Sequence, residues 1–156
     1  MVWCQYLIIS LASVALGALL GYFLNKRGVQ NERAARERMQ LQSAVKGLLT
    51  EMNANLELIK KGPDMALLPR LAKDMWNIHK SKIVELPSEM QTCLYEAYAG
   101  IDYVNAVLDT RVAVGPRGHG PGEWDTRYKN EAEKARKPIE IARDALQEWL
   151  KEPKRG

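Results

Sequence analysis

The first 24 residues form an uncharged and mostly apolar run, since none of them is Asp, Glu, Lys, Arg or His. An α-helix rises about 1.5 Å per residue, so residues 2–24 would extend roughly 34 Å and match the roughly 30 Å hydrocarbon core of a bilayer. Aromatic residues stand at the two ends, Trp3 at one and Tyr22 with Phe23 at the other, as is common at membrane interfaces. The pattern predicts an N-terminal transmembrane helix at residues 2–24.

A cleaved signal peptide is the alternative for this run. Signal peptides begin with positive charge and have a short apolar core, and the run has neither feature. We therefore expect residues 1–27 to form an uncleaved anchor.

Small residues recur every four positions along one side of the run, at Ser13, Gly17 and Gly21. Such a track lets two helix backbones approach closely in lipid, where packing replaces the hydrophobic effect. It predicts a homodimer through the membrane helix. Alanines place small residues on the other sides as well, so an ordinary unpaired membrane helix is the alternative.

Basic residues follow the apolar run directly and outnumber the two acidic residues among them. They are Lys26, Arg27, Arg33, Arg36 and Arg38. The positive-inside rule then predicts an N-terminus outside and a C-terminal domain in the cytoplasm, in a bacterial inner (plasma) membrane. The same side chains are candidate contacts for anionic lipid, each worth on the order of 1 kcal/mol near the surface. A solvated helix face that acts only as a topology signal is the alternative.

The rest of the chain carries apolar residues at helical spacing, and alternating β-branched runs are nearly absent. Long helices are predicted at about 31–61, 88–111 and 123–151, with a short one at 69–80. The fold class is therefore all-α: a transmembrane helix, then a small antiparallel bundle of three long helices and one short crossover helix over residues 28–151. The strongest stripe lies in the second long helix, at Met90, Leu94, Ala97, Ile101, Val104 and Leu108.

Local signals mark where these helices begin and end. Gly62 followed by Pro63 ends the first long helix, and Ser88 with Gln91 forms a capping box at the start of the second. Gly28 either breaks the chain between anchor and bundle or lies inside one continuous helix.

Glycine and proline also shape the C-terminal part of the chain. Their density over residues 113–122 predicts an exposed flexible loop. Pro138 predicts a kink or a restart of the last helix near Lys137. Residues 152–156 are expected to form a disordered tail.

Asn55 interrupts the apolar stripe of the first long helix between Met52 and Ile59. A buried amide needs hydrogen-bond partners, so Asn55 either bonds to another helix and fixes its register or is only half covered. In the second case the stripe turns to Leu56.

Charge is confined to the part after residue 25, where 23 Lys and Arg and 19 Asp and Glu give a net charge of +4. This mild positive bias favours anionic lipid head groups or acidic partners. No compact run of basic and aromatic residues points to nucleic acid. Cys4 lies in the apolar run and Cys93 in a predicted soluble helix, so the two cannot easily form a disulfide bridge. This arrangement fits a reducing compartment.

Residues suited to catalysis or metal binding are sparse. His79 and His119 are the only histidines, and neither has a second His or Cys at metal-ligand spacing. The Glu-x-x-His pattern of carboxylate-bridged metal bundles is absent. We expect no enzyme activity, no cofactor and no metal. The carboxylates that could pair across the bundle are Glu51, Glu57, Asp102 and Asp109.

Four stretches in the middle of the chain carry a resemblance: residues 48–56 (LLTEMNANL), 71–76, 85–87 (ELP) and 94–105. They resemble a loose pattern in uncharacterised bacterial single-pass membrane proteins with a small helical cytoplasmic domain. The resemblance implies a bacterial inner-membrane setting. No activity is known for those proteins, so no functional residue is carried over.

The functional expectation is a membrane-tethered helical protein-interaction module at the inner face of a bacterial membrane. Its partners would be the lipid bilayer, a second copy and an unknown protein. The alternative is a single-pass sensory or signalling adaptor that transmits a change from the membrane helix to the bundle. A helix continuous through Gly28 would favour the adaptor, and a flexible break there would favour a passive tether.

Overall fold

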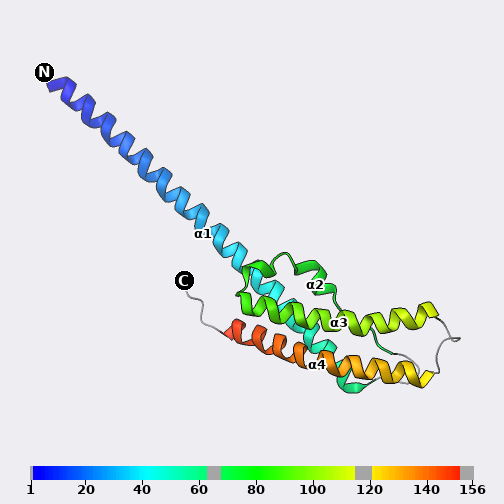
Figure 1. The fold of residues 1–156 in the computed structure, drawn as a ribbon. Coiled ribbons are helices and arrows are strands. Elements are labelled where there is room, and N and C mark those ends of the chain that lie inside the picture. The colour runs from blue at the N-terminus through cyan, green and yellow to red at the C-terminus, as the bar shows by residue number, and fades with distance from the viewer. Residues whose placement is uncertain (1, 63–67, 115–120, 152–156) are drawn as a thin grey trace. The chain divides into compact units, whose positions relative to one another are not determined.

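The computed structural model describes residues 2–62, 68–114 and 121–151, and their secondary structure is helical apart from short connections. Of residues 2–16, 114 and 121 only the backbone is described. No strand occurs within these ranges, which confirms the all-α fold. The elements in chain order are α1 (Val2–Lys61), α2 (Asp74–His79), the 3₁₀ helix η1 (Ile83–Glu85), α3 (Ser88–Val114) and α4 (Pro121–Lys151) (Figure 1).

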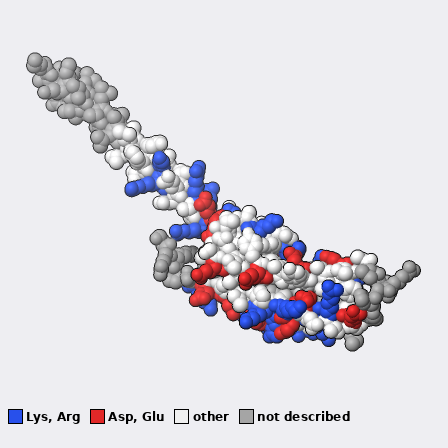
Figure 2. All heavy atoms as spheres, in the orientation of Figure 1, with Lys and Arg blue, Asp and Glu red and all other residues white. Residues whose placement is uncertain are grey.

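The chain divides into two compact units, residues 1–40 and 41–156. In the first unit, residues 17–40 of α1 are all exposed, with apolar side chains first and basic side chains after them (Figure 2). The second unit contains the end of α1 together with the remaining helices. Leu41 is the first described residue that is not exposed, so the bundle begins there.

The predicted transmembrane helix at residues 2–24 is corrected by the structure. Within the part of the chain that was described, no helix has a stretch long and apolar enough to cross a bilayer. A span needs about 20 mostly apolar residues, and the side chains described for α1 start at Gly17 and reach Lys26 and Arg27 within ten residues. The side chains of residues 2–16 lie outside the described part.

Helix α1 extends much further toward the N-terminus than the predicted range 31–61. Gly28 lies inside it, so of the two alternatives for this glycine the structure supports the uninterrupted helix. The predicted end is confirmed: α1 stops at Lys61, and the next residue, Gly62, has a φ of 72°. The Gly62 N–H donates to the Ile59 carbonyl at 3.2 Å, as in a glycine C-cap.

The core of the bundle follows the predicted stripes. Helices α3 and α4 lie side by side and run in opposite directions (Figure 1). Their apolar rows meet the buried residues of α1, which include Val45, Leu48 and Met52. The buried members of the α3 and α4 rows include Met90, Leu94, Ala97, Ile101, Val104, Tyr128, Ala135, Ile139, Ala142 and Leu146.

The short crossover helix is smaller than predicted. The pattern indicated residues 69–80, but α2 covers only Asp74–His79 and residues 68–73 are not helical. Ile78 on this helix is 63% exposed. Pro69 disfavours a helical conformation for the residue before it, and the contacts described below supply partners for an extended backbone.

Other expectations about helix ends also changed. Residues 113 and 114 belong to α3, and Pro121 and Gly122 open α4, so the predicted loop 113–122 is shorter at both ends. Residues 115–120 and the tail 152–156 lie outside the described residues. Helix α4 continues through Pro138, so the predicted restart near Lys137 is wrong.

The start of α3 uses a different cap from the predicted capping box. The side-chain amide of Gln91 donates to the Leu86 carbonyl at 2.8 Å and to the Val84 carbonyl at 3.3 Å. It therefore ties the preceding turn to the helix, instead of accepting from the N–H of Ser88. The connection into α3 is fixed by this side chain.

The close approach of α3 and α4 generates a prediction. A Cβ added at Gly100 would lie 3.1 Å from the Cβ and 3.2 Å from the backbone Cα of Ala135. Because the backbone of α4 must move to admit it, we expect Gly100→Ala to lower the free energy of unfolding by about 1–3 kcal/mol. Urea denaturation followed by circular dichroism measures this loss.

Gly47→Ala is the matched control. It adds the same methyl group to a helix, but its nearest neighbour is the flexible Met75 side chain, with the sulfur at 3.1 Å. Alanine also favours the helix over glycine by up to about 1 kcal/mol, so a near-neutral change is expected. Equal losses for the two variants would contradict a rigid α3–α4 contact at Gly100.

Candidate functional site

Residues 68–73 cross the bundle without forming a helix or strand, and we call this segment the strap. Leu71 in its middle is only 2% exposed. A buried backbone must find hydrogen-bond partners for its N–H and C=O groups, and the strap has no ladder or helix to supply them. Side chains of α1, α3 and α4 supply these partners.

Two asparagines bind the strap backbone in the same way. The Leu71 N–H donates to Oδ1 of Asn105 at 2.9 Å, and Nδ2 of Asn105 donates to the Leu71 carbonyl at 2.9 Å. Asn55 repeats this pattern with the N–H and carbonyl of Ala72, at 2.8 Å each. A carboxamide has a donor and an acceptor side by side, so one side chain satisfies both backbone groups of one residue.

The two asparagines come from different helices and are fully enclosed. Asn55 lies on α1 and is 0% exposed, and Asn105 lies on α3 and is 3% exposed. The hypothesis that Asn55 is buried and bonded is confirmed, although its partner is the strap and not another helix. Leu56 is buried as well, but Asn55 is fully buried beside it, so the alternative in which Asn55 is only half covered is wrong.

Glu51 secures the residues that follow the strap. Its carboxylate, 5% exposed, accepts from the N–H of Met75 at 2.8 Å and of Trp76 at 3.3 Å, and so caps the first turn of α2. It also accepts from the hydroxyl of Tyr98. Negative charge at a helix N-terminus is favourable. The ring of Trp76 stacks on Tyr98 with centroids 4.3 Å apart.

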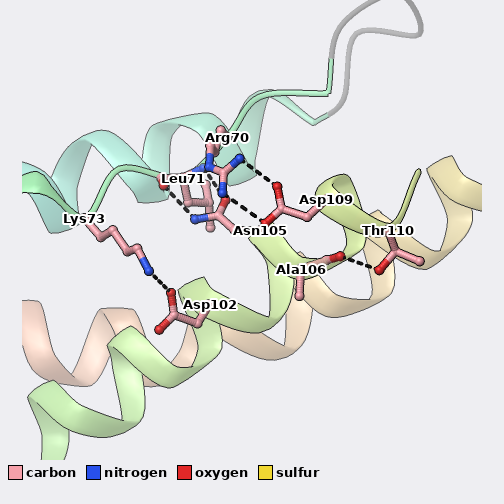
Figure 3. A network of polar contacts seen from close by, with 8 residues as sticks. All are labelled: Arg70, Leu71, Lys73, Asp102, Asn105, Ala106, Asp109 and Thr110. Atoms are coloured by element: carbon pink, nitrogen blue, oxygen red, sulfur yellow. Dashed lines mark hydrogen bonds and ion pairs between the residues drawn. The ribbon is translucent and has the colours of Figure 1, made fainter. Parts of the chain in front are cut away.

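Ion pairs flank the asparagine contacts (Figure 3). The Arg70 guanidinium binds the two carboxylate oxygens of Asp109 at 2.8 and 3.1 Å, and the Lys73 ammonium binds Asp102 at 2.6 Å. These four side chains are 40–60% exposed. Exposed pairs contribute at most about 1 kcal/mol each, so they orient the strap more than they stabilise it.

The α3 partners form one row. Tyr98, Asp102, Asn105 and Asp109 are spaced by four, three and four residues and therefore share one face of the helix. Because Arg70 pairs with the last of them and Trp76 with the first, the chain from residue 70 to 76 runs antiparallel to α3.

The hydroxyl of Tyr128 on α4 donates to the Pro69 carbonyl and holds the beginning of the strap. The strap is thus held by side chains of three helices that lie 17 or more residues away along the chain. This constellation holds an internal segment of the chain, because its polar groups are directed at the backbone and at the charged side chains of that segment.

Three of the four carboxylates considered for pairing across the bundle serve this site, whereas Glu57 is exposed and lies 3.6 Å from the ammonium of Lys60. Glu51, Asp102 and Asp109 each bind the strap or the start of α2. Within the described ranges no group of three or more His, Cys, Asp or Glu side chains is placed to hold a metal ion. His79 and Cys93 are partly buried, and His119 lies outside the described residues.

The strap site contains none of the residues that the sequence singled out for the membrane helix and its basic flank. A Cβ at Gly17 or Gly21 would meet nothing within 4 Å, and the side chain of Ser13 lies outside the described part. The basic flank is exposed throughout, with Arg36 3.5 Å from Glu32. These residues are Lys26, Arg27, Arg33, Arg36 and Arg38.

Asn55, Asp102 and Asp109 stand out in the sequence as candidate polar contacts, but Asn105 and the row that it forms with its α3 neighbours do not. A signal was present, since residues 98, 102, 105 and 109 repeat at helical spacing beside the apolar stripe. Such a row of groups that form hydrogen bonds is usually solvated, and nothing in the pattern shows that a distant segment covers it.

The buried asparagines generate a stability prediction. Asn105→Ala leaves the Leu71 N–H and carbonyl without partners inside the bundle, so we expect the free energy of unfolding to fall by about 2–4 kcal/mol. Asn53→Ala is the matched control, because Asn53 is exposed on α1 and its removal should change stability by less than about 0.5 kcal/mol. Urea titration of the two variants compares them, and similar small effects would show that the strap does not depend on Asn105.

The buried tyrosines generate a pH prediction. Burial raises the pKa of Tyr98 above its usual value near 10, the hydrogen bond to Glu51 and the negative charge of Glu51 raise it further, and burial raises the pKa of Tyr128 to about 12. Above pH 10 the unfolded chain loses tyrosine protons that the folded chain keeps, so stability should fall as pH rises. Each retained proton accounts for about 1.4 kcal/mol per pH unit.

Tyr98→Phe should therefore flatten the decline of unfolding free energy between pH 10 and 12, whatever its effect at neutral pH. Tyr103→Phe is the control, because Tyr103 is 68% exposed. Urea titrations at several pH values give the two slopes. An unchanged slope in Tyr98→Phe would rule out Tyr98 as a source of the alkaline loss.

Comparison with known proteins adds no homologue. No protein-family model matches the chain, and the searches of curated proteins and of solved structures found no match. The resemblance to uncharacterised bacterial membrane proteins therefore stays a prediction.

Proposed function

We propose that this chain is a non-catalytic helical protein-interaction module located at the inner face of a bacterial membrane. The observation that carries the location is the exposed part of α1, where large apolar residues are followed directly by basic ones. The module has two kinds of partner, an anionic lipid surface and another protein.

The apolar residues of this region are exposed to an unusual degree. Leu19, Leu20, Tyr22, Phe23 and Leu24 are each at least 56% exposed. Contiguous exposed apolar side chains usually mark a surface that is covered by a partner or by lipid. A helix without packing partners is also marginal in water, which again favours a covering surface.

The basic residues support lipid as the covering surface. Five basic residues against two acidic ones leave an excess of three positive charges on residues 26–38, and all of them are exposed. Aromatic side chains beside Lys and Arg are typical of segments that contact the head-group region. Charge complementarity thus favours anionic lipid.

The bundle supports a role in protein binding without chemistry. Among the described residues, the buried polar side chains are Glu51, Asn55 and Asn105, and each of them binds backbone groups of the same chain. Tyr95 and Tyr103 on α3 are 52% and 68% exposed. Exposed tyrosines are enriched at protein interfaces because they combine apolar area with a polar end.

A sensory or signalling adaptor is the second candidate, and one observation favours it. Helix α1 has no break at Gly28, as such an adaptor requires. Hydrogen exchange with and without anionic vesicles distinguishes the two roles. A tether should change protection only at residues 17–40, whereas an adaptor should also change it in α3 and α4.

Vesicle co-sedimentation of the full chain tests the location. The chain should bind vesicles of phosphatidylglycerol and phosphatidylethanolamine more strongly than vesicles of phosphatidylcholine, and added salt should weaken this preference. Neutralising the basic flank should reduce binding to the anionic vesicles by roughly tenfold or more, since each charge contributes on the order of 1 kcal/mol. The variant replaces Lys26, Arg27, Arg33, Arg36 and Arg38 by Gln.

A second variant with the same change in net charge is the control. It replaces five exposed lysines of the bundle by Gln, namely Lys61, Lys80, Lys129, Lys137 and Lys151. Binding should stay close to that of the unchanged chain. An equal loss in the two variants would show that net charge alone is responsible, and no preference for anionic vesicles would refute the location.

A further inference from the structure

The strap is held by contacts that are typical of peptide recognition. Regular elements in a helical bundle pack through side chains, whereas the strap is held through its own backbone. Asn105 and Asn55 each bind the N–H and carbonyl of one residue, and such contacts recognise an extended chain whatever its side chains are. The two asparagines bind the neighbouring residues Leu71 and Ala72. Binding through both of them therefore requires an extended backbone over these two residues.

Side-chain contacts add selectivity to the backbone contacts. Leu71 is enclosed among apolar core residues at 2% exposure, which demands a large aliphatic group. Asp109 and Asp102 bind basic side chains one residue before and two residues after this leucine. Ala72 is partly buried between them. The order that satisfies every contact is basic, leucine, small, basic.

We infer that the α1 and α3 side chains that bind the strap, together called the groove, form a peptide-binding site that the strap occupies here in cis. In trans it takes an extended partner segment of the form basic-leucine-small-basic. The inference rests on the proposed role in protein interaction, because it names the partner class. The occupant is a segment of another protein with this pattern, and the complementary charges of Asp102 and Asp109 argue for it.

Competition with the strap controls this binding. The strap is tethered to the groove, so its effective concentration exceeds that of any free peptide and the apparent affinity in trans is low. The segment also lacks regular secondary structure, and two of its contacts are exposed ion pairs. Weakening the strap without altering the groove raises the fraction of open sites and tightens binding in trans.

A labelled peptide with the sequence of residues 68–76 tests the inference by fluorescence anisotropy. Leu71→Ala in the full chain shortens the side chain that fills the groove, and the leucine of the added peptide can replace it. We expect the dissociation constant of this peptide to be lower for Leu71→Ala than for the unchanged chain by roughly thirtyfold or more. A peptide with its arginine and lysine changed to glutamate should bind at least about tenfold more weakly.

Asn105→Ala in the Leu71→Ala background is the control within the groove. It keeps the weakened strap but removes both hydrogen bonds to the leucine backbone, so peptide binding should weaken by about tenfold or more. Arg70→Ala with Lys73→Ala serves if Leu71→Ala does not fold. Their side chains are 60% and 40% exposed, and we expect the peptide to bind this variant a fewfold more tightly than the unchanged chain.

Absence of peptide binding to folded Leu71→Ala and to the Arg70, Lys73 double variant would overturn the inference. Binding unaffected by Asn105→Ala would overturn it as well, because the peptide would then lie elsewhere. A dimer of the unchanged chain that Asn105→Ala abolishes would make a second copy the occupant and so contradict the choice of partner. Vesicle binding is measured separately, so failure here leaves the membrane location intact.

Discussion

The fold of the bundle depends on how the buried peptide groups of Leu71 and Ala72 are satisfied. An extended segment inside a helical protein has no neighbouring strand, and an unpaired buried N–H or carbonyl costs about 1–3 kcal/mol. Asn105 and Asn55 remove this cost with two hydrogen bonds each. Leu71 can then enter the core, and α2 can begin where Glu51 caps it.

This constraint explains the polar residues in the core. Glu51, Asn55 and Asn105 are the polar side chains buried among the described residues, and each binds backbone atoms of residues 71–76. A buried carboxylate in a helical bundle can suggest metal or acid–base chemistry. Here its oxygens accept hydrogen bonds from two backbone N–H groups and one hydroxyl, so the carboxylate holds a segment of the chain in place.

The contacts around the strap divide into two classes with different weights. The enclosed asparagine and glutamate contacts hold the strap, because burial at these positions keeps water from replacing a lost hydrogen-bond partner. The pairs of Arg70 and Lys73 are open to solvent and contribute little energy, but they set the direction and register of the segment along α3. The groove binds backbone groups through its enclosed amides and basic side chains through its exposed carboxylates. This combination suits the recognition of a short extended sequence and so links the architecture to the proposed role in protein binding.

The helices and most of the core could be read from the sequence, because helical periodicity is a local property. The α3 stripe from Met90 to Val104 is buried as predicted, and the end of α1 at Gly62 follows from local backbone chemistry. The nonhelical conformation of residues 68–73 could not be read in this way. Its partners lie 17 to 59 residues away along the chain, and no local pattern records which distant side chains will meet. Periodicity and composition are sufficient to give an all-helical chain with amphipathic faces and a basic flank. The first half of the expected short helix is nonhelical because only the folded bundle brings the amides of Asn55 and Asn105 within reach of its backbone.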